Sequence, residues 1–216
     1  MFKGIKSIFF DFDGVILDSV DSKSVAFEGL YKKYGKKISS KVKEFHIKNG
    51  GISRFEKFKY WHKEYLGIEL DDKGINELAN SFSVLVFNKV VNSSKIHGID
   101  KFLEKNFGKY RYWLITGTPT NEIHRILKKI NYLKFFKGIF GSPKSKFYWI
   151  EKLINENNLN RNEILFIGDS ITDYKAASFS QIKFALVNHK YNFKTFEKVD
   201  VFKFDSFDQL QLKLDE

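Results

Sequence analysis

The sequence of 216 residues contains no cysteine, which excludes disulfide bonds and cysteine-ligated metal sites. It also lacks a hydrophobic run long enough to span a membrane, and its first residues lack the apolar region of a signal peptide. We therefore expect a cytoplasmic protein that does not associate with membranes. Arginine is scarce too, with only four residues, so most of the positive charge comes from lysine.

The net charge of +11 raises the question of nucleic-acid binding. Lysine supplies 33 of the 37 basic residues, and the lysines are scattered, without the dense blocks or interleaved aromatic residues of RNA-binding proteins. The pattern does not favour a nucleic-acid partner, although a diffuse positive field would attract an anionic substrate. A hydrophobic content of 43% at this length predicts one globular core domain plus an insertion.

The first hydrophobic segment ends in two carboxylates. Residues 5–10 are rich in β-forming residues, as in a buried parallel strand, and Asp11, Asp13 and Gly14 follow. Ligands of open α/β sheets bind beyond the carboxyl ends of the strands. Two neighbouring carboxylates repel each other unless a cation neutralises them, and Mg²⁺ accepts such oxygen ligands. Taken alone, the segment also fits an ordinary strand-to-loop junction with solvated acids.

Residues 20–92 have a helical pattern and no convincing parallel strand. Apolar residues recur at helical spacing, and glycines and capping residues separate helices predicted at 21–34, 41–48, 53–66 and 72–91. This segment predicts a small helical cap domain, inserted into a core domain made of residues 1–19 and 93–216.

From residue 97 onward, strands alternate with helices. The strands are predicted at 110–115, 138–141, 163–167, 183–187 and 199–204. Alternation of this kind predicts an α/β fold with a doubly wound parallel sheet.

Polar groups suited to phosphate or Mg²⁺ follow three of these strands. They are Thr116 and Gly117 after the strand at 110–115, Lys144 and Lys146 after the strand at 138–141, and Asp169 and Asp173 after the strand at 163–167. Each group alone has an ordinary explanation; Thr116 and Gly117, for example, precede a helix start at Pro119. Together with Asp11 and Asp13 after the first strand, four strand ends carry such groups. This predicts one shared site for phosphate and a metal ion.

With these motifs the chain resembles the haloacid dehalogenase superfamily, in the subgroup of phosphohydrolases with a helical cap after the first strand, such as phosphoglycolate phosphatase and β-phosphoglucomutase. The resemblance covers nearly the whole core. The four family motifs match, in order, Asp11-Phe12-Asp13-Gly14-Val15 with Asp18 and Ser19, then Thr116, then Lys146, then Gly168-Asp169 with Asp173. The family pattern Gly-Ser-Pro-x-x-Lys, read from Gly141, selects Lys146 over Lys144.

The resemblance implies phosphoryl transfer in two steps. Asp11 would attack phosphorus and form an aspartyl-phosphate. Asp13 would protonate the leaving alcohol and then activate the water that hydrolyses the intermediate. Dehalogenases of the superfamily lack an acid at the place of Asp13 and transport ATPases have threonine there, so Asp13 favours a phosphatase or a phosphomutase.

The resemblance also implies which residues hold the ligands. Those that would bind the phosphate are Thr116, Gly117 and Lys146. Those that would bind Mg²⁺ are Asp11, the backbone carbonyl of Asp13, and Asp169, with Asp173 assisting through water or by fixing Lys146.

The cap segment 46–57 contains a glycine pair between two predicted helices. Such a loop could bring Asn49, Arg54 or Lys57 to the mouth of the active site as substrate-binding residues. Arg54 is one of the four arginines, which suggests a bidentate contact with an anion. An ordinary helix–helix turn with solvated basic residues explains the segment equally well. Structural roles are expected for Lys23, His46 and His124, and for Asp18 and Ser19 in the loop entering the cap.

The resulting expectation is a Mg²⁺-dependent phosphatase acting on a small phosphorylated metabolite, such as a sugar phosphate or a phosphoglycolate-like compound. A phosphomutase of the β-phosphoglucomutase type and a non-enzymatic binding module on the same fold remain alternatives. We expect a monomer or a weak homodimer.

Overall fold

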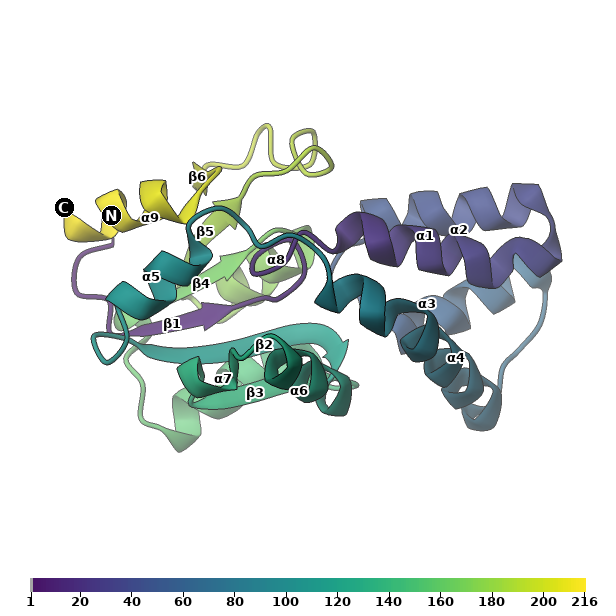
Figure 1. Ribbon diagram of the computed structural model, residues 1–216, viewed down its shortest axis with the longest axis horizontal. Coiled ribbons are helices and arrows are strands. Elements are labelled where there is room, and N and C mark those ends of the chain that lie inside the picture. The colour runs from purple at the N-terminus through teal and green to yellow at the C-terminus, as the bar shows by residue number, and fades with distance from the viewer. Residues whose placement is uncertain (1) are drawn as a thin grey trace.

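The computed structural model describes residues 2–216, and its centre is a six-stranded parallel sheet (Figure 1). The strands are β1 (Ser7–Phe10), β2 (Arg111–Pro119), β3 (Gly138–Ser142), β4 (Ile164–Gly168), β5 (Lys183–Val187) and β6 (Phe202–Phe204). Their spatial order is β3-β2-β1-β4-β5-β6, and every neighbouring pair is parallel. The chain therefore winds outward from β1 in both directions, which confirms the predicted doubly wound sheet.

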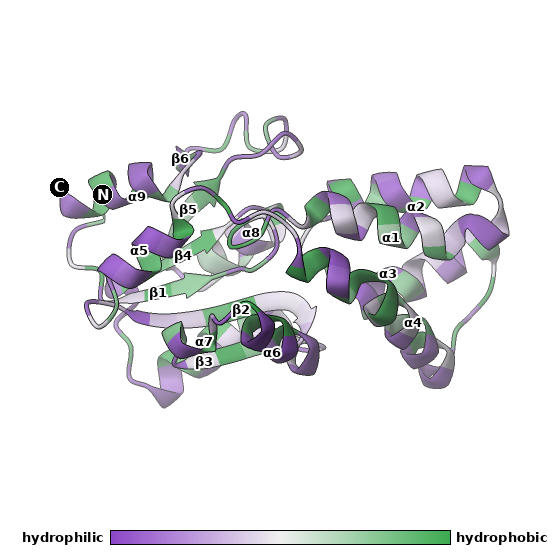
Figure 2. Ribbon diagram, viewed as in Figure 1, coloured by the Kyte–Doolittle hydropathy of each residue, from purple (hydrophilic) through white to green (hydrophobic). Residues whose placement is uncertain are grey.

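Helices cover both faces of the sheet. Successive side chains of β1 point to opposite faces, and because those of Ile8, Phe9 and Phe10 are all apolar, both faces have to be buried. Ile8 and Phe10 pack into one hydrophobic cluster with α5 (Ile99–Lys105), α6 (Thr120–Lys129) and α9 (Phe207–Asp215). Phe9 packs into a second cluster with α7 (Lys146–Glu156) and α8 (Ile171–Phe179). Figure 2 shows hydrophobic residues along the inner strands β4 and β5. Burial on both faces explains why the strands are continuous hydrophobic runs.

Four helices lie together beyond the carboxyl ends of the strands (Figure 1). They are α1 (Val20–Tyr31), α2 (Lys36–Lys48), α3 (Arg54–Trp61) and α4 (Asp72–Val91). Aromatic side chains join them: the rings of Phe27 and Phe82 stack with centroids 3.8 Å apart, and Trp61 meets Phe27 edge-on at 5.0 Å. The arrangement is the predicted inserted helical cap, whereas the exact residue bounds of the two domains stay a prediction.

Several predicted boundaries were wrong by a few residues. Helix α2 begins at Lys36 rather than near residue 41, because its first turn carries mainly lysine and serine and gives little apolar periodicity. The predicted helix 53–66 is α3 followed by a π-helical turn, η2 (His62–Leu66). Strand β2 continues beyond residue 115 and, after a register shift, pairs Pro119 with Ser142. Within residues 2–216, none of the helices combines the length and apolar character needed to cross a membrane.

Candidate active site

Three carboxylates meet at the carboxyl ends of β1 and β4. In these neighbouring strands Phe10 pairs with Ile167, so the residues that follow both strands lie at the same edge of the sheet. Asp11, Asp169 and Asp173 are buried there, and each places an oxygen within 4.8 Å of the others. The structure therefore brings together three of the acidic residues that the sequence singled out.

Asp173 is held by the first turn of α8. Its Oδ2 accepts hydrogen bonds from the amides of Ser170 at 3.1 Å and Asp169 at 3.3 Å, and from the Ser170 hydroxyl. A Cβ at Gly168 would lie 2.4 Å from the Cβ of Asp173, so a side chain at this position would not fit. The glycine thus allows β4 and α8 to approach closely enough to fix the carboxylate.

Lys146 joins Asp173 to Asp11. It is the first residue of α7, where the hydroxyl of the N-cap residue Ser145 accepts a hydrogen bond from the amide of Tyr148 at 3.1 Å. The Lys146 Nζ lies 2.8 Å from Asp11 Oδ2 and also donates to Asp173 Oδ1. Burial lowers the pKa of Lys146, but the two carboxylates outweigh burial and raise it. Lys146 is therefore a buried, fully charged ammonium beside Asp11.

The carboxylate cluster has the composition of a Mg²⁺ site. Asp11 Oδ1 is buried and finds no hydrogen-bond partner within residues 2–216, which is costly unless a ligand occupies the position. Burial raises the pKa of Asp11 to about 8, although the charge of Lys146 opposes the shift. A bound cation would reverse that shift. Oxygen-only ligands of this kind fit Mg²⁺. The Asp13 side chain is not part of the cluster, so its backbone carbonyl as a ligand stays a prediction.

The Asp13 side chain points to helix α1. It accepts hydrogen bonds from the Ser19 hydroxyl, from the Lys23 ammonium and, at 3.2 Å, from the Thr118 hydroxyl. Lys23 also donates to Thr118 Oγ1 at 2.7 Å. Burial raises the pKa of Asp13, but the charge and hydrogen bond of Lys23 outweigh burial and lower it. Asp13 is therefore an ionised, well-oriented carboxylate.

Thr116 and Gly117 lie near the end of β2 and line the pocket next to Asp11. The Thr116 hydroxyl oxygen accepts a hydrogen bond from the amide of Thr118 at 3.3 Å. A Cβ at Gly117 would lie 2.9 Å from the carbonyl oxygen of Gly51. Position 117 therefore needs glycine where the cap meets the core.

The glycine pair of the cap, Gly50 and Gly51, lies on the first turn of α8. The Thr172 hydroxyl donates a hydrogen bond to the Gly50 carbonyl at 3.0 Å. Gly51 has a φ of +78°, and a Cβ on it would lie 1.8 Å from Thr172 Oγ1. Only glycine combines this backbone conformation with so close a contact. The α2–α3 loop therefore closes over the end of the sheet that carries the carboxylates.

Two of the three predicted cap residues line the pocket. Asn49 does not, because its side-chain amide turns back and donates to the Phe45 carbonyl at 2.9 Å. Arg54 lines the pocket, but its guanidinium forms a bidentate ion pair with Glu122 of α6, with both N–O distances 2.7 Å. The bidentate contact expected for Arg54 is thus made to a carboxylate of the protein.

Lys57 is the other cap residue that lines the pocket. Its side chain is only 2% exposed, and its Nζ lies 2.8 Å from Nδ1 of His46 on α2. Burial lowers the pKa of Lys57 to about 7, and the charge of Lys23 adds to the shift. The alternative of solvated basic residues in this segment is wrong for Arg54 and Lys57, since both are buried.

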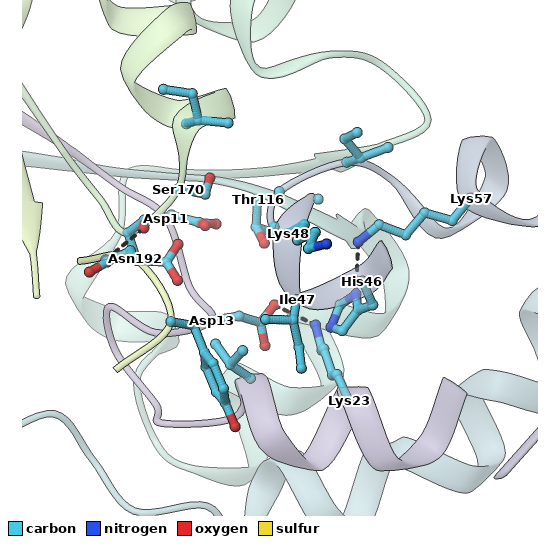
Figure 3. Close-up of a pocket in the computed structure, with 18 of the residues that line it drawn as sticks. Asp11, Asp13, Lys23, His46, Ile47, Lys48, Lys57, Thr116, Ser170 and Asn192 are labelled. Carbon is cyan, nitrogen blue, oxygen red and sulfur yellow. Dashed lines mark hydrogen bonds and ion pairs between the residues drawn. The ribbon is translucent and has the colours of Figure 1, made fainter. Parts of the chain in front are cut away.

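The cap and the core contribute opposite charges to the pocket. Figure 3 shows Asp11, Asp13 and Thr116 on one side and the cap residues His46 and Lys57 on the other. The carboxylates come from the strand ends, whereas the lining lysines come from the cap helices.

Five residues around the pocket were not predicted as site residues: Lys23, His46, Glu122, His189 and Asn192. His189 Nε2 lies 2.9 Å from Asp169 Oδ2, and the Asn192 side chain donates to the Asp169 backbone carbonyl at 2.9 Å. Both belong to the loop after β5, where no motif marks them. Lys23 alone had a usable signal, because it lies one helical turn after Ser19, at the start of a predicted helix.

The comparisons with known proteins agree with this geometry. The family model described as "Haloacid dehalogenase-like hydrolase" matches residues 8–187. The phosphoglycolate phosphatase of Pseudomonas fluorescens is 23% identical over 205 residues, covering 86% of this chain and 70% of the relative. That of Pseudomonas savastanoi is 24% identical over 199 residues, covering 87% of this chain and 71% of the relative.

Solved structures show the same fold at low sequence identity. A β-phosphoglucomutase from Clostridium difficile has a TM-score of 0.77 at 20% identity, covering 98% of this chain and 97% of its own. A haloacid dehalogenase-like family hydrolase from Streptococcus pneumoniae has a TM-score of 0.70 at 21% identity, covering 97% and 99%. At these identities the likeness shows the fold alone.

Proposed function

The chain belongs to the haloacid dehalogenase-like hydrolase family, and we propose that it is a Mg²⁺-dependent phosphatase acting on a small phosphorylated metabolite through an aspartyl-phosphate. The substrate would be a sugar phosphate or a phosphoglycolate-like compound. The observation that carries the proposal is the position of Asp11, which lies 2.8 Å from the Lys146 ammonium in a cluster of buried carboxylates. The two curated relatives, named phosphoglycolate phosphatase, support the substrate class.

Asp11 is the proposed nucleophile. An oxygen of its carboxylate attacks phosphorus, a new O–P bond forms, and the bond from phosphorus to the alcohol oxygen breaks. In the second step water attacks the aspartyl-phosphate, which releases inorganic phosphate and restores the carboxylate. The Lys146 ammonium, together with a bound cation, would keep the Asp11 carboxyl ionised, as a nucleophile has to be.

Asp13 is the proposed general acid and base. It protonates the leaving alcohol oxygen in the first step and takes a proton from water in the second. The hydrogen bonds from Ser19, Lys23 and Thr118 hold its carboxylate in one orientation. Its lowered pKa supports the second role, since the ionised carboxylate can accept a proton, and the proton taken from water is then the one given to the leaving oxygen of the next turnover.

Phosphate and metal would share the end of the pocket next to Asp11. Thr116, Gly117 and Lys146 would hold the phosphate oxygens, and Lys146 would neutralise charge on the group being transferred. The residues that would hold Mg²⁺ are Asp11, Asp169 and the backbone carbonyl of Asp13, with Asp173 fixing Lys146. Mg²⁺ would supply charge neutralisation for the phosphoryl group.

One observation favours a second candidate, a phosphomutase with the same intermediate. The Gly50–Gly51 loop lies directly on the core, and such closure would protect an aspartyl-phosphate from water until a second hydroxyl accepts the phosphoryl group. A binding module without activity is disfavoured, because binding alone needs neither a cation beside Asp11 nor an oriented carboxylate at Asp13.

The decisive experiment measures inorganic phosphate released from a panel of phosphorylated metabolites. We expect release that requires Mg²⁺, stops with a chelator and is lost in Asp11→Asn. Conversion of a sugar phosphate into its isomer without phosphate release would favour the phosphomutase. A folded protein that binds Mg²⁺ but turns over no compound would contradict both activities.

A further inference from the structure

The cap side of the pocket carries more positive charge than the carboxylates near it neutralise. The basic residues that line the pocket there are Lys23 on α1, Lys48 at the end of α2, and Arg54 and Lys57 on α3. Two of them have a carboxylate partner: Lys23 pairs with Asp13, and Arg54 with Glu122. Lys48 is exposed, so water solvates its charge.

Lys57 is the exception. No carboxylate oxygen within residues 2–216 lies within 4.0 Å of its Nζ, and its hydrogen bond goes to His46 Nδ1. Burial lowers the pKa of His46 well below its usual value, so the imidazole is neutral and contributes no charge. The nearest aromatic ring is that of Phe27, with its centroid 5.8 Å from the Lys57 Nζ. No carboxylate of the described residues therefore contacts this buried amino group, and Asp13 and Asp169 act on it only from a longer distance.

A buried ammonium without an anion is unfavourable, because it has lost its hydration and gained no opposite charge. The side chain does not turn away to solvent. Figure 3 shows it extending from α3 toward the pocket, on the side opposite Asp11. The hydrogen bond to His46 fixes the ammonium in that direction and makes His46 a positioning residue. An anion that enters the pocket from solvent would complete this arrangement.

We propose that Lys57 binds a second anionic group of the substrate, a carboxylate or a second phosphate, at the end opposite the phosphate that Asp11 attacks. The proposal rests on the proposed function for the position of the transferred phosphate. It narrows the substrate class to phosphate monoesters that carry another anion. A neutral sugar tail would offer Lys57 no opposite charge, so the closed cap favours a substrate whose other end carries an anion.

Arg54 also lines the cap side of the pocket, but unlike Lys57 it already has a carboxylate partner. Its guanidinium already donates hydrogen bonds to both carboxylate oxygens of Glu122, so a substrate anion would have to compete with an intact buried ion pair. Lys57 gains its first charged partner when the substrate binds. The free energy of that contact is therefore available for discrimination between substrates.

Binding of phosphonates tests the proposal without requiring any catalytic activity. The probes are 3-phosphonopropionate, which carries a carboxylate, and propylphosphonate, which has the same chain length and a neutral end. We expect calorimetry to show that the native protein with Mg²⁺ binds 3-phosphonopropionate about 10- to 100-fold more tightly than propylphosphonate. This ratio corresponds to the free energy of one hydrogen bond to a charged group. Ethane-1,2-diphosphonate, as a third probe, decides between a carboxylate and a second phosphate as the preferred anion.

Two variants assign the preference to Lys57. Lys57→Met should lose the preference for the charged probe, and Lys57→Gln provides the same test if the first variant does not fold. Lys59→Met is the matched control, because Lys59 is on the same helix but exposed, and the preference should persist in it. Equal binding of both probes by the native protein would overturn the proposal. A Lys57 variant that weakens both probes equally would also overturn it, since Lys57 would then hold the transferred phosphate.

Phosphate release separates this proposal from the proposed function. The matched substrates are 2-phosphoglycolate and 2-hydroxyethyl phosphate, which differ in the charge of the end group. Equal release of phosphate from both substrates would overturn the role of Lys57 but would still support the proposed phosphatase activity. A binding preference without any release of phosphate would support Lys57 as an anion-binding residue and contradict the phosphatase.

Discussion

Arg54 of helix α3 and Glu122 of helix α6 form a buried bidentate ion pair between the cap and the core. Both N–O distances are 2.7 Å, and the hydroxyl of Ser83 on α4 also donates to the carboxylate. Burial raises the pKa of Glu122, but the hydrogen bonds and charge of Arg54 outweigh burial and lower it. Three segments of the chain are thus joined through one carboxylate.

Glu122→Gln should lower the free energy of unfolding by about 3–5 kcal/mol, because it leaves the Arg54 charge buried without a counter-ion. Urea unfolding at pH 7 measures the loss. Glu151→Gln is the matched control, since Glu151 forms the same bidentate pair with Arg161 at 2.7 and 2.8 Å, but with about a third of each side chain open to solvent. That variant should lose only about 0.2–1 kcal/mol. Equal losses in the two variants would contradict a structural role for burial of the Arg54–Glu122 pair.

Gly51→Ala should impair activity far more than stability. The new Cβ would lie 1.8 Å from Thr172 Oγ1, so the loop cannot keep its contact with α8, and the catalytic geometry is lost. We expect kcat/KM to fall about 100-fold, the usual effect of a displacement of about 1 Å at an active site. Gly67→Ala is the control: its φ of +68° carries the same backbone strain, but no atom lies within 4 Å of the added Cβ. If Gly67→Ala loses as much activity, loop closure is not the cause.

The free energy of unfolding should rise with pH above about 7 because of Lys57. Its folded pKa is about 7 and its usual value is 10.5, so between these values the unfolded chain binds more protons than the folded one. The contribution to stability therefore increases from pH 7 to pH 10.5, by at most about 1.4 kcal/mol per pH unit. The charged and titratable groups around Lys57 are His46, Lys23, Arg54, Asp13 and Asp169.

Urea unfolding of the native protein and Lys57→Met at pH 7, 8 and 9 isolates this effect. The difference in free energy of unfolding between the two proteins should change with pH, since the variant lacks the titrating group. Lys59→Met should follow the native curve. A constant difference between native and Lys57→Met across this range would show that Lys57 titrates as it does in the unfolded chain.

Mg²⁺ should stabilise the native protein more than a variant of the carboxylate cluster. Added Mg²⁺ at about 100 times its Kd should contribute about 2.7 kcal/mol to the free energy of unfolding. Asp169→Asn should lose most of this gain, because it removes one of the three clustered carboxylates. Asp200→Asn, at an exposed acid, should retain it. A melting temperature that Mg²⁺ raises equally in all three proteins would argue against the cluster as the binding site.

The strands and the chemistry at their ends could be predicted from the sequence because both are local properties. The run at Ile8, Phe9 and Phe10 is hydrophobic on both faces, and the two hydrophobic clusters confirm that reading. The carboxyl ends of parallel strands share one edge, so the placement of Asp11 beside Asp169 follows from topology alone. Whether these residues perform the roles that the resemblance implies stays a prediction.

The contacts of the cap could not be predicted in the same way. Arg54 and Glu122 are 68 positions apart, and Lys57 and His46 lie on different helices. The sequence indicated that Arg54 would contact an anion, but not that the anion belongs to the protein. The position of the Asn49 side chain could not be predicted either. Its neighbours Lys48 and Gly50 line the pocket, but its own side chain turns back to the carbonyl of Phe45.

The sequence by itself determined the parallel sheet, the insertion of a helical segment after the first strand, and the gathering of acidic and basic groups at one edge. Hydrophobic periodicity and the alternation of strands with helices along the chain predict these features, and both are encoded locally. Only the tertiary structure decided which cap bases pair with a carboxylate of the protein and which do not. That outcome depends on how the cap helices pack against α6 and α8, because the partner of a buried charge is set by approach in space and not by separation along the chain.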